Sequence, residues 1–146
     1  MKKKLPVRGF TLIEILVVIG IIAILAAVVI IAINPARQFA QARNSQRQSN
    51  ITSILNALGQ NLADNKGITT CTGITTSSST IGTVGVDLST CLSSYLPTGI
   101  PFDPAATTTT NTNYVVSMDS TGRYLVCAPL SNESALNNPG VLCVKR

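Results

Sequence analysis

Glu14 is the ionisable residue with the most unusual surroundings in this sequence. Residues Ile15–Ile33 follow it directly and are nineteen consecutive positions without a charge. A carboxylate at membrane depth costs on the order of 3 kcal/mol, so it needs a partner or a function. Beyond Arg8, no cation of the chain lies within helical reach of Glu14. Cleavage of the chain just before Phe10 would create a partner, because the new α-amino group would lie four residues away.

The four cysteines predict disulfide bonds rather than a zinc or redox centre. Cys71, Cys91, Cys127 and Cys143 are separated by 20, 36 and 16 residues and form no CxxC pair. An even number of cysteines in a small exported domain indicates two disulfides. Three pairings are possible, and buried free thiols are the alternative. We favour Cys71–Cys91 and Cys127–Cys143, because each closes a local loop and the second ties the C-terminal strand to its predecessor.

Enzymatic chemistry has few candidate residues in this chain. It has no histidine and six carboxylates, which excludes a Ser-His-Asp triad, a histidine base and an HExxH zinc site. A cysteine nucleophile would have no histidine to activate it. The sequence therefore predicts a protein that is not an enzyme and needs no cofactor.

The positive charge is concentrated before residue 10. Four of the eleven cations lie there, and the remaining seven face six anions. The net charge of +5 thus falls to about +1 over the rest of the chain, so nucleic acid is not indicated as a partner. The four cations are Lys2, Lys3, Lys4 and Arg8.

The stretch Phe10–Ile33 is long enough to cross a membrane as a helix, which takes about 20 apolar residues. A secretory signal peptide is the alternative, since Ala40-Gln41-Ala42 resembles a cleavage site, but the apolar stretch is longer than such peptides have. The cations before residue 10 predict a cytoplasmic N-terminus and an exported C-terminal part. Three more widely spaced cations, Arg37, Arg43 and Arg47, oppose this bias.

A second, amphipathic helical segment is expected over residues 34–66. Pro35 predicts a bend rather than a stop, so the helix would continue from Phe10 to about Asn65. Lys66-Gly67 ends the helical pattern. One stripe of this segment should face a core, because its apolar residues recur at three- and four-residue spacings: Phe39, Ile51, Ile54, Leu55, Leu58 and Leu62.

The rest of the chain indicates a small antiparallel sheet packed on that stripe, which makes the fold class α+β. A short strand is expected near Ile81–Val86, before a rigid proline-rich connector over residues 96–104. Two strands, Asn113–Met118 and Arg123–Leu130, flank a turn, and Gly140–Val144 would add another.

The beginning of the chain resembles a known family. The residues Arg8-Gly9-Phe10-Thr11-Leu12-Ile13-Glu14, followed by the apolar stretch, are similar to the prepilin leader and N-terminal motif of type IV pilins and their pseudopilin relatives. The resemblance implies a leader over residues 1–9, a membrane-spanning and filament-core helix over 10–33, its amphipathic continuation over 34–66, and an exported β-rich domain over 67–146.

In that family a prepilin peptidase cuts after the glycine that precedes the apolar helix and methylates the new N-terminus. The resemblance therefore implies cleavage after Gly9 and N-methylation of Phe10. Glu14 would neutralise the terminal amine of a neighbouring subunit during assembly, which makes a buried carboxylate tolerable and sets the axial register. The alternative is a protonated Glu14, or one that reaches the membrane interface.

The family implies a structural subunit of a type IV pilus-like filament, anchored in the cytoplasmic membrane before assembly. Its partners would be other copies of the chain, the prepilin peptidase, an assembly ATPase and a platform membrane protein. Two alternatives remain: a pseudopilin of a type II secretion system, or a minor pilin that acts in adhesion or DNA uptake.

Three aspartates are weak calcium candidates, because some pseudopilins with a similar proline-rich loop bind calcium there. The spacing of Asp87, Asp103 and Asp119 is not that of an EF-hand, so we interpret them as solvated turn carboxylates. Arg43 and Arg47, four residues apart, are expected on the wet face of the helix. Asn50-Ile51-Thr52 and Asn132-Glu133-Ser134 match the N-glycosylation pattern and are interpreted as surface markers.

Overall fold

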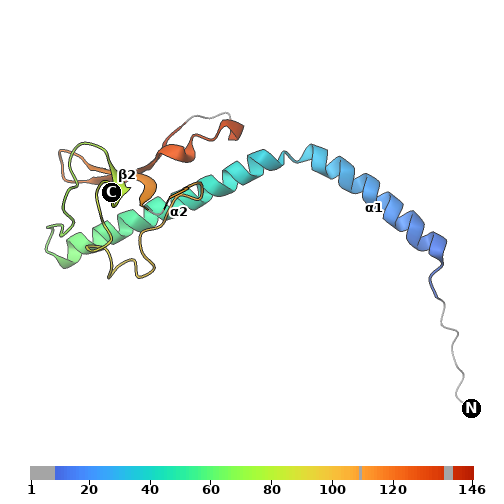
Figure 1. Cartoon of the computed structure of the whole chain (residues 1–146), viewed down its shortest axis with the longest axis horizontal. Helices are drawn as coiled ribbons and strands as arrows, with labels where there is room; N and C mark the ends of the chain where they lie inside the picture. The colour runs from blue at the N-terminus through green and yellow to red at the C-terminus, as the bar shows by residue number, and fades with distance from the viewer. Residues whose placement is uncertain (1–8, 109, 137–139) are drawn as a thin grey trace, which may run out of the picture. The chain divides into compact units, whose positions relative to one another are not determined.

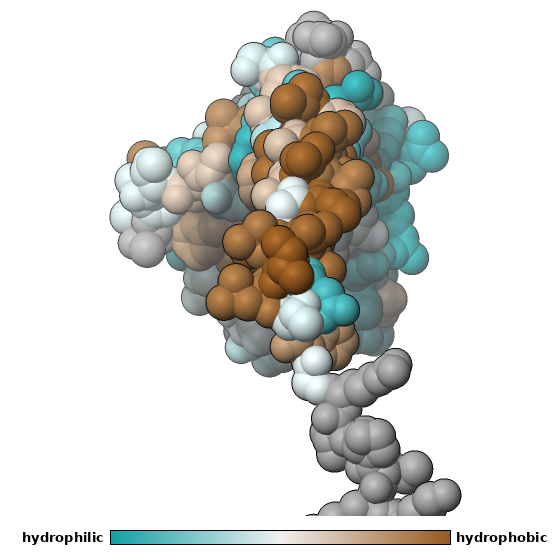
Figure 2. All heavy atoms as spheres, turned by 90° about the vertical axis from the view of Figure 1, so that its right-hand side faces the viewer, coloured by the Kyte–Doolittle hydropathy of each residue, from teal (hydrophilic) through white to brown (hydrophobic). Residues whose placement is uncertain are grey.

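The computed structural model describes residues 9–108, 110–136 and 140–146. The chain divides into two compact units, Met1–Pro35 and Ala36–Arg146, and each is described by itself. The first unit contains helix α1, Leu12–Ala32, none of whose residues is buried. Among the described residues, α1 is the one helix long and apolar enough to cross a membrane. Figure 2 shows apolar side chains gathered along this helix.

The helix is interrupted at Ile33–Asn34, so the expected continuous helix is wrong at this point. Ile33 has the extended angles φ −96° and ψ 112°, and α2 begins at Pro35 and ends at Asp64. Proline cannot donate the backbone hydrogen bond that a continuing helix needs, and it disfavours helical angles in the preceding residue. As the first residue of a new helix it is favourable.

Helix α2 ends where the sequence pattern predicted. Lys66 and Gly67 adopt left-handed angles, with φ values of 56° and 85°. The Gly67 N–H donates to the Leu62 carbonyl at 2.7 Å, which satisfies one of the last carbonyls of the helix. The prediction that Phe39 faces the core is wrong, because 65% of its surface is exposed.

Four antiparallel strands form one sheet in the order β1-β2-β3-β4. Cys127 of β3 lies opposite Cys143 of β4 in the strand register. Two short 3-10 helices connect these two strands. The strands are β1 Ser79–Gly82, β2 Asn111–Met118, β3 Tyr124–Ala128 and β4 Leu142–Lys145, and the 3-10 helices are η1 Pro129–Ser131 and η2 Ser134–Leu136.

The first predicted strand is shorter than expected, because the chain turns back after Gly82. Val86 returns to pair with Ile81 in a parallel bridge, and its N–H donates to the Thr80 carbonyl at 2.8 Å. A Cβ on Gly85 would collide with that same carbonyl. This return therefore depends on a glycine.

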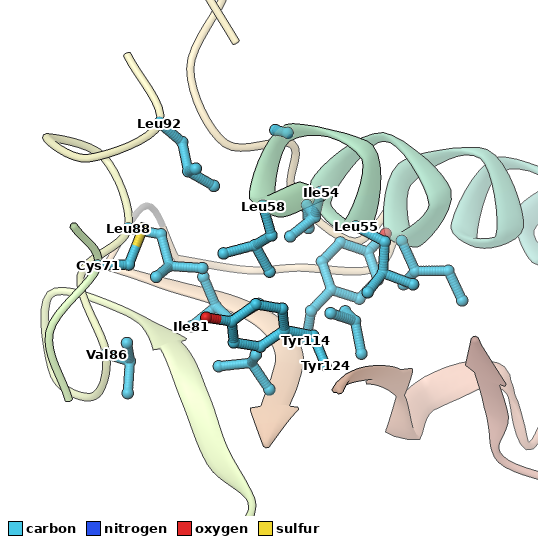
Figure 3. Packing of buried hydrophobic residues seen from close by; sticks show 14 of the residues in the cluster. Ile54, Leu55, Leu58, Cys71, Ile81, Val86, Leu88, Leu92, Tyr114 and Tyr124 are labelled. Carbon is cyan, nitrogen blue, oxygen red and sulfur yellow. The ribbon is translucent and has the colours of Figure 1, made fainter. Parts of the chain in front are cut away.

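The core lies between the C-terminal half of α2 and the sheet, which confirms the predicted α+β fold. Figure 3 shows Ile54, Leu55 and Leu58 pointing from α2 toward the sheet residues Tyr114 and Tyr124. The Asn50 amide donates to the Tyr114 hydroxyl at 2.8 Å, so the phenol is buried with a hydrogen-bond partner.

The structure pairs Cys71 with Cys91 and Cys127 with Cys143. This is the connectivity favoured from the sequence because each bond closes a local loop. The second bond joins the adjacent strands β3 and β4, and the first holds the segment after α2 against the loop that contains Leu92.

Candidate functional site

The start of helix α1 holds Glu14 in a reciprocal cap with Thr11. The Thr11 backbone N–H and hydroxyl both donate to Glu14 Oε2, at 2.7 and 2.8 Å. In return, the Glu14 N–H donates to the Thr11 hydroxyl at 3.3 Å. This capping box satisfies two N-terminal donors of the helix and places the carboxylate beside the backbone just before it.

The backbone before α1 is accessible. Gly9 and Phe10 belong to no helix or strand, and 85% of the Phe10 surface is exposed. Apart from its chain neighbours, no described residue would lie within 4 Å of a Cβ built on Gly9. Both described residues at this peptide bond are therefore exposed in the isolated chain. The cations Lys2, Lys3, Lys4 and Arg8 lie outside the described residues.

Helix α1 presents apolar side chains on every side. Its large apolar residues are each at least 50% exposed. A helix that is apolar on every side belongs in lipid or among other helices, because exposing this surface to water costs free energy. Glu14, near its first turn, is its single charged residue.

One family model matches the part of the chain that contains this arrangement. Residues 5–33 match the prokaryotic N-terminal methylation motif. The chain carries the prepilin-type signal of type IV pilins and pseudopilins. No curated protein and no solved structure matches the chain.

The prepilin motif supports a type IV pilin-like or pseudopilin-type protein, a structural class that is generally not enzymatic. Together with the apolar helix α1 it indicates membrane anchoring. The prepilin motif covers Gly9, Phe10 and Glu14, the three residues singled out from the sequence.

A second polar cluster lies in the unit Ala36–Arg146, and the sequence analysis missed it. Arg47 is 1% exposed instead of forming a wet face. Its Nε donates to Asp103 Oδ2 and its Nη1 to Glu133 Oε1, both at 2.6 Å. Arg43 holds the same glutamate with bonds of 2.8 and 2.7 Å. Arg43 first, and then Arg47, lower the pKa of Glu133 to about 2.

A signal for this cluster was present in the sequence. Arg43, Arg47 and Asn50 continue the three- and four-residue spacing of Ile54 and Leu58. A polar residue in the register of an apolar stripe faces the core and must find a partner there. Asn50 shows the same effect, because it is 7% exposed and donates to the Phe102 carbonyl at 3.0 Å. It is therefore not the surface marker expected from its glycosylation pattern.

The three aspartates named as calcium candidates serve other contacts. Asp103 is 3% exposed and binds the Arg47 guanidinium with both oxygens, so it is not a solvated turn carboxylate. Asp119 forms an ion pair of 2.5 Å with Lys145. Asp87 accepts a hydrogen bond of 2.9 Å from the Ser89 N–H. The described part of the chain contains no group of three or more His, Cys, Asp or Glu residues that could hold a metal ion.

Proposed function

We propose that this chain is a structural subunit of a type IV pilus-like filament. It is cut after Gly9, methylated on Phe10 and assembled through helix α1. The observation that carries the proposal is a carboxylate, Glu14, at the start of a fully exposed apolar helix inside a prepilin motif. A simple membrane anchor has no need of such a carboxylate.

Cleavage supplies the missing partner for Glu14. The new amine on Phe10 lies one residue before Thr11, whose N–H and hydroxyl already bind the Glu14 carboxylate. The amine of a neighbouring subunit completes the charge balance in the filament. An unpaired charge among apolar helices costs free energy. Each subunit therefore binds the filament at the axial position where its carboxylate and the neighbouring amine pair.

Helix α1 serves twice in this mechanism. It first anchors the chain in the cytoplasmic membrane, with the N-terminus inside and the domain exported. It then packs against the same helix of other copies. Transfer from lipid to filament changes its neighbours without exposing its apolar surface to water. The prepilin peptidase, an assembly ATPase and a platform membrane protein supply the remaining steps.

The second candidate is a pseudopilin of a type II secretion system. It is favoured by the proline-rich connector over residues 96–104, which α2 holds through Asn50 and the Phe102 carbonyl, and through Arg47 and Asp103. A minor pilin that acts in adhesion or DNA uptake would share the same motif.

Mass spectrometry of native cells tests the proposal. Trypsin cuts after Arg8 and Arg37, so the precursor yields Gly9–Arg37 and the processed chain yields N-methylated Phe10–Arg37. The internal peptide Gln48–Lys66 measures the total amount of subunit in each fraction.

Methylated Phe10–Arg37 in sheared surface filaments is the expected result. The same peptide confined to the membrane fraction would favour a pseudopilin or a minor subunit. Retention of Gly9 in all fractions would exclude processing and leave an uncleaved single-span anchor.

A further inference from the structure

The two disulfides of the chain lie in different surroundings. Cys71 is 4% exposed and belongs to the core, and Cys91 packs against that core. Cys143 is exposed and Cys127 is half-buried, and neither is among the described residues that form the core or pack against it. A thiolate must reach a sulfur atom to exchange with a disulfide. Cys127–Cys143, which we name the edge disulfide, is therefore the more accessible of the two bonds.

The edge disulfide points away from the core because side chains alternate along a strand. In β3, Cys127 lies between Val126 and Ala128, which are fully buried. In β4, Cys143 precedes Val144, which packs against the core. Successive side chains of a strand point to opposite faces of the sheet. The bond thus lies on the face of the sheet opposite to the core and α2.

The order of the strands decides which of the two sulfur atoms is open to attack. Cys127 has Val115 of β2 opposite it on one side and Cys143 of β4 on the other. A thiolate displaces one sulfur from the other, so it approaches from the side opposite the leaving sulfur. For Cys127 Sγ that approach crosses β2 at Val115. For Cys143 Sγ it comes from beyond β4, the last strand of the described sheet.

The edge disulfide closes a segment that binds α2. Between its two cysteines, the Ser131 carbonyl accepts a hydrogen bond of 3.0 Å from the Asn44 amide of α2. The Glu133 carboxylate of the same segment forms ion pairs with Arg43 and Arg47 of α2. Figure 1 shows η1 and η2 of this segment, in orange to red, beside α2. The bond therefore joins the two ends of a segment whose middle holds the helix.

Opening the edge disulfide should loosen this segment. A cross-link restricts the open states of the segment that it closes, and its removal makes those states more favourable. Without the bond, β4 stays in place through its ladder with β3 at the edge of the sheet. Elements with few buried contacts open at a lower free energy than core elements do. The contacts of Ser131 and Glu133 with α2 are therefore the first that we expect to be lost.

We propose that the edge disulfide is a redox-sensitive switch, opened by an external thiol in the folded chain while Cys71–Cys91 stays closed. The external thiolate bonds to Cys143 Sγ, the S–S bond breaks, and Cys127 leaves as a thiolate. A second external thiolate then attacks the first external sulfur and releases the Cys143 thiolate. Two external thiols are thus oxidised to a disulfide, their protons pass to the two cysteines, and Ser131 and Glu133 are released from α2.

Differential alkylation of the full chain, solubilised from membranes in detergent, tests the exchange. The chain is incubated with reduced glutathione or with reduced thioredoxin, and free thiols are blocked with N-ethylmaleimide. The remaining disulfides are then reduced in denaturant and labelled with iodoacetamide. Chymotrypsin separates Cys127 from Cys143, which trypsin leaves together in the peptide 124–145.

The edge disulfide should react first. Cys127 and Cys143 should acquire N-ethylmaleimide faster than Cys71 and Cys91, by about tenfold or more. The mixed disulfide with glutathione should be found on Cys143. Reaction with thioredoxin alone would identify a protein dithiol as the reductant, and reaction with glutathione as well would identify any accessible thiol.

The protease Glu-C measures the release of the segment, because the chain has two glutamates and only Glu133 lies between β3 and β4. Cleavage after Glu133 should become several-fold faster once the edge disulfide is open. Cys127→Ser/Cys143→Ser should show the fast cleavage without any thiol. The matched control Cys71→Ser/Cys91→Ser should keep the slow cleavage and become faster when glutathione is added. Cleavage after Glu14 provides the reference rate in every sample.

The outcomes that overturn this inference are distinct from those that test the proposed function. Equal rates for the two disulfides, or no reaction of the edge disulfide, overturn selective exchange. A mixed disulfide on Cys127 overturns the assigned point of attack. Unchanged cleavage after Glu133 in wild-type chain whose edge disulfide is open overturns the release. The inference concerns the exported domain, so it stands whether or not methylated Phe10–Arg37 is found in sheared filaments.

Discussion

Arg47 and Asp103 form a fully buried ion pair, with Arg47 Nε 2.6 Å from Asp103 Oδ2 and side-chain exposures of 1% and 0%. The pair joins α2 to the proline-rich connector across 56 residues of sequence. Asp103 also accepts the Ala105 N–H at 2.8 Å, which shapes the connector itself. One guanidinium thus holds the proline-rich connector against α2.

Removal of either partner of this pair should destabilise the domain strongly. Arg47→Ala leaves Asp103 as an unpaired buried charge, which typically costs about 3–5 kcal/mol. Asp103→Ala should cost less than this, because Arg47 keeps its ion pair with Glu133. Urea denaturation of residues 36–146 measures the free energy of unfolding. Arg43→Ala serves as the control and should lower the free energy of unfolding less. Arg43 is 37% exposed, and Glu133 retains its ion pair with Arg47 in this variant. Equal losses of unfolding free energy in Arg43→Ala and Arg47→Ala would contradict the larger contribution expected of the buried Arg47–Asp103 pair.

Stability should fall in acid because of Glu133. Arg43 and Arg47 lower its pKa from 4.5 to about 2 in the folded chain. A depressed pKa contributes stability that is complete above pH 4.5 and is lost as the pH falls toward 2. The free energy of unfolding of wild type and Glu133→Gln, measured from pH 7 to pH 2, should converge in this window. Parallel curves would show that Glu133 does not contribute to the loss of stability in acid.

The two disulfides should stabilise the domain by similar amounts. They close loops with sequence separations of 20 and 16 residues, and a loop of this length is worth about 3 kcal/mol. Cys71→Ser/Cys91→Ser and Cys127→Ser/Cys143→Ser should therefore lower the free energy of unfolding to a similar extent. Thermal unfolding of the two double variants makes the comparison. A large loss in one variant alone would show that loop closure is not the main contribution.

Substitution of Glu14 should separate anchoring from assembly. Glu14→Ala and Glu14→Gln keep the apolar helix, so the chain should still insert into the membrane. Both remove the charge that pairs with the terminal amine of a neighbour, so filaments should be absent or distorted. Electron microscopy and immunoblots of membrane fractions give the two readouts. Normal filaments from Glu14→Gln would refute the role of the charge.

Much of this molecule follows from local sequence. An uncharged apolar run of nineteen residues specifies a helix in a membrane, because a helix satisfies every backbone group within the segment. The end of α2 at Lys66-Gly67 is equally local, since it needs only a left-handed turn. The two disulfides join cysteines that are neighbours in the sequence order, which is why loop closure favoured the same pairs.

Only the tertiary structure decided how far the domain extends along α2. Helical spacing predicted Phe39 and Ile54 on the core stripe, and Arg47 was wrongly expected on the wet face. The spacing contains no information on which turns of α2 the rest of the domain covers. Phe39 is open, and Arg47 is buried, because the partners of Arg47 come from residues 56 and 86 positions away. The periodicity of a helix determines which side faces inward, whereas the length that is buried depends on distant chain segments that no local pattern specifies.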